Sequence, residues 1–503
     1  MGPLTAIVAL PIVGAIALSF VDPEDHKTLR FVAMVFAVAA FVASLVVVAR
    51  FDTAEAGFQL VEQLEWIPSI GASYKLGVDG ISLVLVVLTT FLTPLILLAS
   101  WRVDERVKGY FASFLVLEGA VLGVFLTLDL LLFYVFWEVM LVPMYLIIGI
   151  WGSANRRYAA IKFFLYTLLG GLLMLVAILF LFSEAGSFDY ATISQLELSQ
   201  TAQGWLFLAF FVAFAVKVPL FPVHTWLPDA HTEAPTGGSV FLAGILLKMG
   251  AYGVLRYSLP IFPDATVDFA PWIIGLSVVG ILYGAVLALM QPDVKRLIAY
   301  SSVSHMGFVM LGIFALTLTS ASAGVVQMVN HGLSTGALFL LVGFLYERRH
   351  TRAINAYGGL AKVVPVMAGF WLVVSLSSLA LPGLNGFVGE FPILLGAFQT
   401  TRWAAVLGAF GAVLAALYLL WVYQRMFHGP VAGPDNEHTT DLHFREVAIL
   451  TPLVILIVAI GVYPKPLYDT VEPSVDRVLQ QAGLSGVGTA DVEGVAPIEG
   501  AGR

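Results

Sequence analysis

The chain has 503 residues, of which 59% are hydrophobic and 12% are charged, and its mean hydropathy is +0.92. Soluble domains carry about 25% charged residues, so this composition indicates a membrane protein and excludes an ordinary soluble one. The net charge of −8 gives no basic surface for nucleic acid, and the absence of cysteine excludes thiolate ligands for an iron–sulfur cluster or a Cys-based zinc site.

The first apolar run covers residues 4–20, and no lysine or arginine precedes it. The first positive charge is Lys27. A secretory signal peptide begins with a basic region and ends at a small-residue cleavage site. We therefore expect the run to be a retained membrane helix.

Apolar segments of spanning length recur along the whole chain. A spanning helix needs roughly 20 mostly apolar residues. By this measure about fourteen candidates begin near residues 3, 30, 78, 110, 130, 160, 203, 238, 271, 300, 322, 364, 402 and 446. The sequence thus predicts an all-α polytopic membrane protein whose termini lie on the same side.

The basic residues of the loops support this count. Loops after odd-numbered helices hold Lys27 and Arg30; Arg102, Arg106 and Lys108; Arg156 and Arg157; Lys295 and Arg296; Arg348, Arg349, Arg352 and Lys362; Arg425 and Arg445. Loops after even-numbered helices are poor in lysine and arginine and are often acidic. The positive-inside rule then places the odd-numbered loops in the cytoplasm and both termini outside.

Two of the predicted helices contain breaks. In the seventh, Pro219 and Pro222 follow Lys217, and in the twelfth the break lies within residues 381–386. A proline inside a helix removes a backbone hydrogen bond and costs ~3 kcal/mol unless neighbours compensate. Broken helices in corresponding positions are typical of inverted-repeat transporters with a site near the midplane.

We therefore predict two inverted five-helix repeats, helices 4–8 and helices 9–13. The expected organisation is residues 1–109 for helices 1–3, 110–260 for the first repeat, 261–430 for the second repeat, and 431–503 for helix 14 and a polar tail. The tail from Tyr463 onward is rich in glycine, and we expect it to be partly ordered at best.

Ionisable residues within spans are the candidate functional groups, because a charge at the bilayer centre costs about 3 kcal/mol on insertion scales. Four such residues are Glu138, Lys217, Lys248 and Glu390. His331 adds a polar stripe to helix eleven together with Asn330, Ser334 and Thr335. Buried glutamate and lysine near each other can exchange a proton when their surroundings change. Linked by water and histidine, such groups are typical of a proton path.

A structural interpretation stays open for each of these residues, since buried charges also form pairs that fix helix packing. His331 fits a plain helix–helix hydrogen bond as well as a proton relay. Glu118 and His305 are weaker candidates that we expect near the water boundary, and for Glu118 we favour a structural role.

Two loop clusters have the residue types of a metal site. The first holds His224, Asp229, His231 and Glu233, and the second holds His428, His438 and His443 with Asp435, Glu437 and Asp441. Neither has the tight helical histidine spacing of a metal site, and oxygen-rich loops are usually just solvated. We assign a metal to neither.

Four motifs resemble those of the antiporter-like subunits of respiratory complex I, NADH:quinone oxidoreductase. They are FWEVMLVPMY (136–145), KVPLFPVHTWLPDAH (217–231), LAGILLKMG (242–250) and YSSVSHMG (300–307). The resemblance extends over about residues 75 to 465. It implies fourteen helices, two inverted five-helix repeats and periplasmic termini.

Glu390 distinguishes between the members of this family. The resemblance implies lysine at this helix-twelve position in the L and N subunits and in the antiporter D subunit, and glutamate in the M subunit, the mitochondrial subunit 4 type. The chain also lacks the long lateral helix of the L subunit after helix fourteen. It therefore resembles the M type most.

The resemblance also implies roles for the candidate residues. Glu138 would modulate Lys217, Lys248 would be the central relay, and Glu390 would lead the proton out to the periplasm. The histidines of helix eleven and of the helix-nine–ten motif would correspond to His331 and His305.

The implied function is proton translocation across a bacterial plasma membrane by a non-redox subunit, driven by NADH oxidation and quinone reduction elsewhere. FMN, iron–sulfur clusters and quinone are expected in partner subunits and no cofactor in this chain, with L-type and N-type subunits as neighbours in the bilayer. The alternatives are a subunit of a Mrp-type cation/proton antiporter, a subunit of a membrane-bound hydrogenase, and a passive scaffold.

Overall fold

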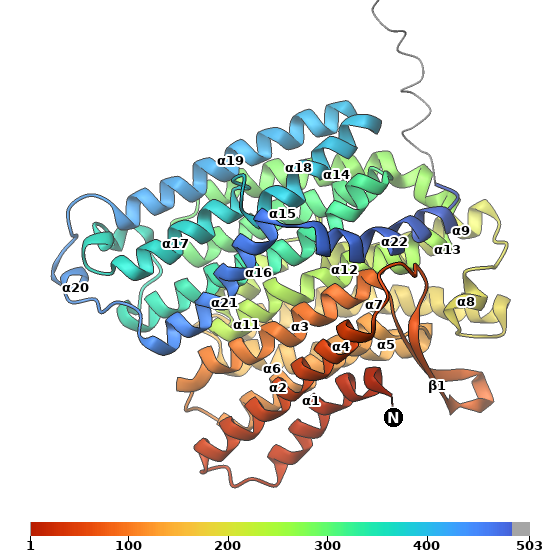
Figure 1. Cartoon of the computed structure of the whole chain (residues 1–503), viewed down its shortest axis with the longest axis horizontal. Coiled ribbons are helices and arrows are strands. Elements are labelled where there is room, and N and C mark those ends of the chain that lie inside the picture. Colours follow the sequence, from red (N-terminus) through yellow and green to blue (C-terminus); the bar gives the residue numbers. More distant parts are fainter. Residues whose placement is uncertain (1, 485–503) are drawn as a thin grey trace, which may run out of the picture.

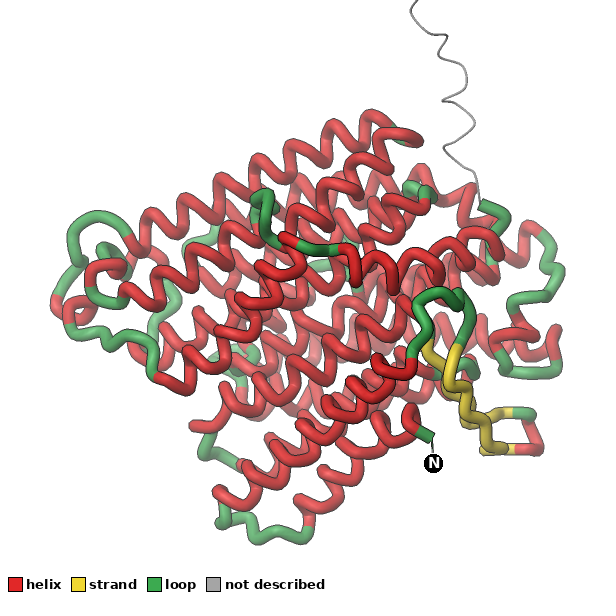
Figure 2. Tube along the Cα trace, in the orientation of Figure 1, coloured by secondary structure: helices red, strands yellow, loops and turns green. Residues whose placement is uncertain are grey.

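The structure is a computed structural model and describes residues 2–484. Long helices lie side by side, and a single two-stranded hairpin is the only sheet in the described range (Figures 1 and 2). The α-helices of the first half are α1 (Pro3–Ser19), α2 (His26–Arg50), α3 (Gly80–Ala99), α4 (Val107–Leu126), α5 (Leu130–Val139), α6 (Leu141–Trp151), α7 (Arg156–Ala185), α8 (Tyr190–Ile193), α9 (Gln200–Lys217), α10 (Trp226–Glu233), α11 (Thr236–Phe241), α12 (Leu247–Gly253) and α13 (Leu259–Ile261).

The second half continues in the same way. Its α-helices are α14 (Pro263–Leu289), α15 (Val294–Phe314), α16 (Leu318–Arg349), α17 (Pro365–Ser378), α18 (Asn385–Thr400), α19 (Arg402–Phe427), α20 (Pro434–Glu437), α21 (Phe444–Val462) and α22 (Lys465–Gln481). The hairpin strands are β1 (Gln59–Ile67) and β2 (Ala72–Val78). The short η segments are η1 (Pro68–Ile70), η2 (Ser100–Arg102), η3 (Leu242–Leu246), η4 (Val254–Ser258), η5 (Ile354–Ala356) and η6 (Leu360–Lys362).

Eleven helical segments of the described chain are long and apolar enough to cross a membrane. The other three predicted spans correspond to α1, which has 17 residues, and to α9 and α17, which both end at a break. The multi-pass helical architecture is confirmed, while the count of fourteen crossings stays a prediction.

Both predicted breaks are present. After α9 ends at Lys217, the chain forms turns before α10 begins, and Trp226 Nε1 donates to the Val216 carbonyl at 2.8 Å. The indole thus satisfies a carbonyl at the helix end, as a helix terminus buried in a membrane requires. The second break separates α17 from α18, and there Asn330 Nδ2 donates to the Asn385 carbonyl at 2.7 Å.

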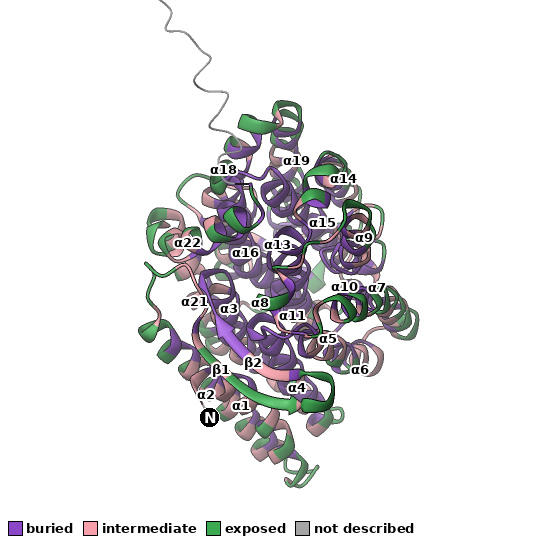
Figure 3. Cartoon of the chain, turned by 90° about the vertical axis from the view of Figure 1, so that its right-hand side faces the viewer, coloured by how far each residue is buried: buried purple, intermediate pink, exposed green. Residues whose placement is uncertain are grey.

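Helix α16 lies in the core of the bundle. Every residue from Ser320 to Leu345 is buried, so no face of this stretch is exposed. Figure 3 shows the buried interior around α16 and the more exposed outer helices. The polar residues of α16 therefore face other helices, with which they can form hydrogen bonds that lipid does not offer.

The hairpin is a departure from the predicted all-α fold. β1 pairs antiparallel with β2, and Ser73 N donates to Asp129 Oδ2 at 2.9 Å. Lys75 forms an ion pair with Asp189. The hairpin thus ties the turns before α5 and α8 together at one end of the bundle, beside the N-terminus (Figure 1).

The expectation of a poorly ordered tail is wrong for residues 465–481, which form α22. Its buried residues Val471, Val475, Val478 and Leu479 recur at helical spacing, so one face packs against α3 and α16. The overall composition of this segment does not show the amphipathic pattern, because the polar residues of the opposite face lower its mean hydropathy. The remainder of the predicted tail, 485–503, lies outside the described residues.

Candidate functional site

Lys248 lies at the start of α12, within a helix that two wide turns interrupt. Its side chain is fully buried, and its Nζ donates to the Ala243 carbonyl in η3. Nζ also lies 2.7 Å from His331 Nδ1 of α16. Single wide turns of this kind often occur at functional sites. Here the turn brings a backbone carbonyl to a buried ammonium group.

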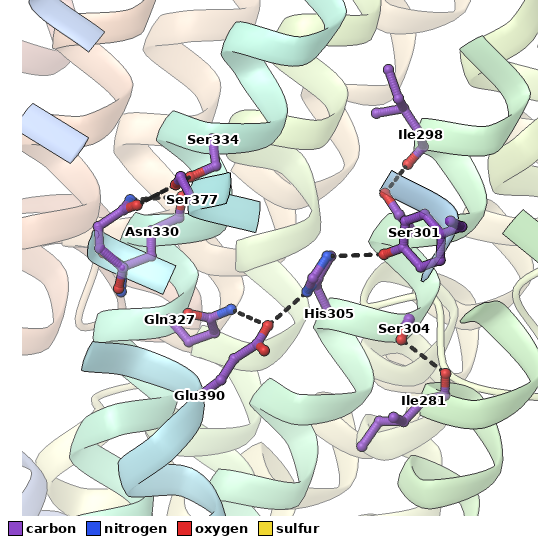
Figure 4. A network of polar contacts seen from close by, with 12 residues as sticks. Ile281, Ile298, Ser301, Ser304, His305, Gln327, Asn330, Ser334, Ser377 and Glu390 are labelled. Carbon is purple, nitrogen blue, oxygen red and sulfur yellow. Dashed lines mark hydrogen bonds and ion pairs between the residues drawn. The ribbon is translucent and has the colours of Figure 1, made fainter. Parts of the chain in front are cut away.

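Two histidines and a glutamate continue from Lys248. The rings of His331 and His305 have centroids 5.8 Å apart, and His305 Nδ1 lies 2.7 Å from Glu390 Oε1. Gln327 Nε2 donates to the same oxygen at 2.9 Å. Figure 4 shows His305 facing the Glu390 carboxylate, with Gln327 on its other side. We call Lys248, His331, His305 and Glu390 the central row.

The break between α17 and α18 places Glu390 in the row. Glu390 lies in the second turn of α18, which begins just after the break. A Cβ at Gly389 would collide with Gln327 Oε1, so glycine permits α18 to approach α16 closely. Ser334 Oγ and Ser377 Oγ lie 2.6 Å apart and join α16 to α17 beside this contact.

Lys217 and Glu138 form no hydrogen bond with each other or with the central row within residues 2–484. Lys217 is fully buried, and its Nζ lies 5.3 Å from the ring centroid of Trp137 and 5.5 Å from that of Phe163. Its nearest polar contact in residues 2–484 is Met140 Sδ at 3.7 Å. The ring faces partly stabilise the ammonium group by cation–π attraction.

The Glu138 carboxylate points toward α7. A Cβ at Gly171 would collide with Glu138 Oε1, so this glycine leaves room for the carboxylate. Oε1 has no hydrogen-bond partner within residues 2–484. The structure therefore brings Lys248, His331, His305 and Glu390 together and sets Glu138 and Lys217 apart from them.

His305 and Glu118, which we expected near the water boundary, are buried inside the protein. His305 is 3% exposed and belongs to the central row, and Glu118 is fully buried in α4. Each lies near the middle of its helix. Hydropathy indicates which helix a residue occupies but not how its neighbours cover it.

His231 was not among the predicted site residues. It is fully buried at the end of α10 and stacks on Phe339 with ring centroids 4.7 Å apart. Within residues 2–484 neither ring nitrogen has a hydrogen-bond partner. The sequence signal that points to His231 is its position in the proline-rich motif directly after the break. We expected this stretch to be a loop, whereas it forms α10.

The first of the two loop clusters is held by ion pairs. Asp229 pairs with Lys162 at 2.8 Å and with Arg296 at 3.6 Å. Glu233 Oε2 accepts from Asn155 N at 2.9 Å. In the described part of the chain, no three His, Asp or Glu side chains are grouped as a metal site requires.

The family model for the membrane domain of NADH:quinone oxidoreductase and Mrp antiporters matches residues 127–415. The model for the amino terminus of NADH-ubiquinone oxidoreductase chain 4 matches residues 26–129. The chain is 47% identical to NADH-quinone oxidoreductase subunit M of Rhodobacter capsulatus, over 95% of this chain and 96% of that one. It is 45% identical to NADH-ubiquinone oxidoreductase chain 4 of Arabidopsis thaliana, over 95% and 97%.

Solved structures agree with these matches. A chain of respiratory complex I from Thermus thermophilus superposes with a TM-score of 0.87 at 32% identity, covering 95% of this chain and all of that one. A chain of the Mrp complex of a Dietzia species gives a TM-score of 0.84 at 21% identity, covering 96% and 98%, which shows a shared fold. The prediction from the four motifs is confirmed: the chain belongs to the family of antiporter-like M subunits, or chain 4, of NADH-quinone oxidoreductase, respiratory complex I.

Proposed function

We propose that protons cross the membrane through this subunit along the central row Lys248, His331, His305 and Glu390. The observation that carries the proposal is the row of four buried titratable groups, with contacts of 2.7 Å at both ends and a distance of 5.8 Å between the centroids of the two histidine rings. Proton transfer requires donors and acceptors within hydrogen-bond reach, directly or through one water. No covalent intermediate is needed.

Glu138 and Lys217 act on this row as a modulating pair. Lys217 has only aromatic and thioether surroundings, so the nearby carboxylate is the charge that decides how well its ammonium form is tolerated. A change in the position or protonation of Glu138 therefore changes the tendency of Lys217 to hold its proton. Lys217 then acts on Lys248 as a charge at a distance.

The energy for translocation comes from redox chemistry in other subunits. This chain has no cysteine to bind an iron–sulfur cluster, and its role in the complex is that of a non-redox proton translocase. FMN, iron–sulfur clusters and quinone belong to partner subunits. In the membrane arm the neighbours are subunits of the L and N types.

The distribution of basic residues supports an orientation. Lysine and arginine follow the odd-numbered helices, which places those loops in the cytoplasm and both termini outside a bacterial plasma membrane. The central row then leads toward the periplasm at Glu390. The alternative, a subunit of a Mrp-type antiporter, predicts a different result: exchange of sodium for protons without NADH.

Glu390→Gln tests the proposal. Glutamine keeps the shape and the contacts to His305 and Gln327 but cannot carry a proton. We expect NADH-driven quinone reduction and acidification of inverted vesicles to fall together by at least about tenfold at matched complex content. Glu24→Gln, at an exposed residue, is the matched control. Unchanged acidification in an assembled Glu390→Gln complex contradicts the proposal.

A further inference from the structure

Tyr418 of α19 lies beside the central row without being one of its members. Its side chain is 1% exposed, and its hydroxyl oxygen lies 3.3 Å from His305 Nε2. A buried tyrosine hydroxyl usually has a hydrogen-bond partner, because an unpaired one costs free energy. The partner here is a ring nitrogen of a histidine that the proposed proton path uses.

The other ring nitrogen of His305 faces Glu390. Nδ1 lies 2.7 Å from Glu390 Oε1, and Gln327 Nε2 donates to the same oxygen at 2.9 Å. Figure 4 shows this carboxylate between Gln327 and the imidazole ring. Oε1 accepts from both neighbours if the carboxyl group is ionised or carries its proton on Oε2. We therefore assign the hydrogen of the neutral His305 ring to Nδ1, which leaves Nε2 as an acceptor.

The Tyr418 hydroxyl suits both protonation states of His305. A tyrosine hydroxyl donates and accepts, and its hydrogen rotates about the C–O bond while the heavier atoms stay in place. When the His305 ring is neutral with its hydrogen on Nδ1, the hydroxyl donates to Nε2. When the ring gains a second proton at Nε2, this N–H donates to the tyrosine oxygen. The ring thus keeps a hydrogen bond at each nitrogen in both states.

We propose that Tyr418 is a positioning residue that holds the His305 ring in line with Glu390 during proton transfer, an inference that rests on the proposed function. In this transfer the Nδ1–H bond of doubly protonated His305 breaks, and the proton forms an O–H bond with the Glu390 carboxylate. His305 is left neutral with its hydrogen on Nε2, and the tyrosine oxygen accepts from it. Without the hydroxyl, this buried N–H would lose its acceptor.

A second tyrosine of α19 provides a matched control. Tyr423 is 9% exposed, and its hydroxyl donates to the Ala368 carbonyl at 3.4 Å. Removal of either hydroxyl therefore breaks one buried hydrogen bond of similar length and leaves the ring in place. Of the two tyrosines, Tyr418 is the one that contacts the central row.

Tyr418→Phe tests the proposal. We expect an assembled complex in which NADH-driven quinone reduction and vesicle acidification fall by about three- to tenfold, the effect of one lost hydrogen bond. The solvent deuterium isotope effect on both rates should rise, because proton transfer then limits turnover more strongly. Tyr423→Phe should keep the wild-type rates and isotope effect. Wild-type rates in Tyr418→Phe, or lower rates with an unchanged isotope effect, overturn the proposal and leave packing as the role of the tyrosine.

His305→Gln shows whether the tyrosine acts through the histidine. We expect Tyr418→Phe to slow the wild-type complex but not to slow the His305→Gln complex further, because the ring that the hydroxyl holds is gone. An equal loss in both backgrounds overturns the proposal. Full rates in His305→Gln alone reject the central row and this inference with it. Slow rates in His305→Gln with wild-type rates in Tyr418→Phe reject only the positioning role.

Two unnatural residues at position 418 provide the test if Tyr418→Phe fails to assemble. p-Aminophenylalanine keeps a group that can donate and accept a hydrogen bond, and p-methylphenylalanine fills the same space without one. We expect rates near wild type with the amino group and a fall of about three- to tenfold with the methyl group. Equal rates in the two complexes overturn the proposal.

Discussion

At the scale of single residues, the buried charges divide into ion pairs with several hydrogen bonds and the residues of the central row, which keep unpaired atoms. Arg256 pairs with Asp79 at 2.5 Å and Arg348 with Glu446 at 2.5 Å, and these pairs are further held by Tyr252 and by backbone carbonyls. Satisfied buried pairs of this kind fix helix positions, and removal of one partner is costly.

The central row is satisfied only in part. Glu390 Oε2 and His331 Nε2 have no hydrogen-bond partner within residues 2–484. An unpaired buried polar atom costs free energy unless water or a proton completes it. Each of these two residues therefore keeps an open position that a proton or a water molecule can occupy in the proposed transfer.

Glu138→Gln should slow the enzyme without disturbing its assembly. Glutamine fits the same space beside Gly171 but removes the negative charge that acts on Lys217. We expect quinone reduction and vesicle acidification to fall together, because the two processes are coupled. Glu184→Gln, at an exposed residue of α7, serves as the control. A Glu138→Gln complex with full rates shows that this glutamate is structural.

The burial of individual residues could be predicted where hydropathy alone decides it. Lys248 and Glu390 stand out because a charge within an apolar segment is costly wherever the helix packs. Glu118 and His231 were misjudged, because their burial depends on helices distant in sequence. No local pattern contains that information.

At the scale of elements, both breaks were predicted and three other features were not. The breaks have strong local signals, since proline and glycine disrupt helices directly. The wide turns η3 and η4 have no comparable signal; η3 lies just before Lys248, and η4 contains Arg256. The hairpin and α22 lie in polar stretches that an analysis restricted to membrane spans treats as loops.

Gly80→Ala should loosen α22. An added Cβ would collide with the Thr470 carbonyl, which belongs to helix backbone and cannot rotate away. We expect faster hydrogen exchange over residues 465–481 and a loss of about 1–3 kcal/mol in local stability. Gly275→Ala in α14 is the control, because a Cβ there meets no heavy atom within 4 Å. Unchanged exchange in the Gly80 variant means that α22 is held by other contacts.

At the scale of the whole molecule, the function follows from how the two halves meet. Lys248 belongs to the first predicted repeat, and His331, His305 and Glu390 belong to the second. The row therefore crosses between them, and a cavity of about 830 Å³ is lined by residues of both halves, among them Thr236 and Lys295. The contact between Lys248 and His331 joins the two halves at this point.

The overall assignment needed little three-dimensional information. Composition and the basic loops predicted a multi-pass helical protein, and the four motifs predicted the complex I family, which the comparisons confirm. The order of contacts along the row and the contacts of the hairpin required the structure. They depend on which helices become neighbours, and no single segment of sequence specifies that.

The most direct test of the central claim measures proton translocation and electron transfer together in the reconstituted complex. Lys248→Met removes the titratable group of the first half that contacts His331, while Lys362→Met removes an exposed lysine and serves as control. We predict that both proton uptake and quinone reduction fall at least about tenfold in the Lys248 variant and stay normal in the control. An assembled Lys248→Met complex that translocates protons at the wild-type rate contradicts the central row.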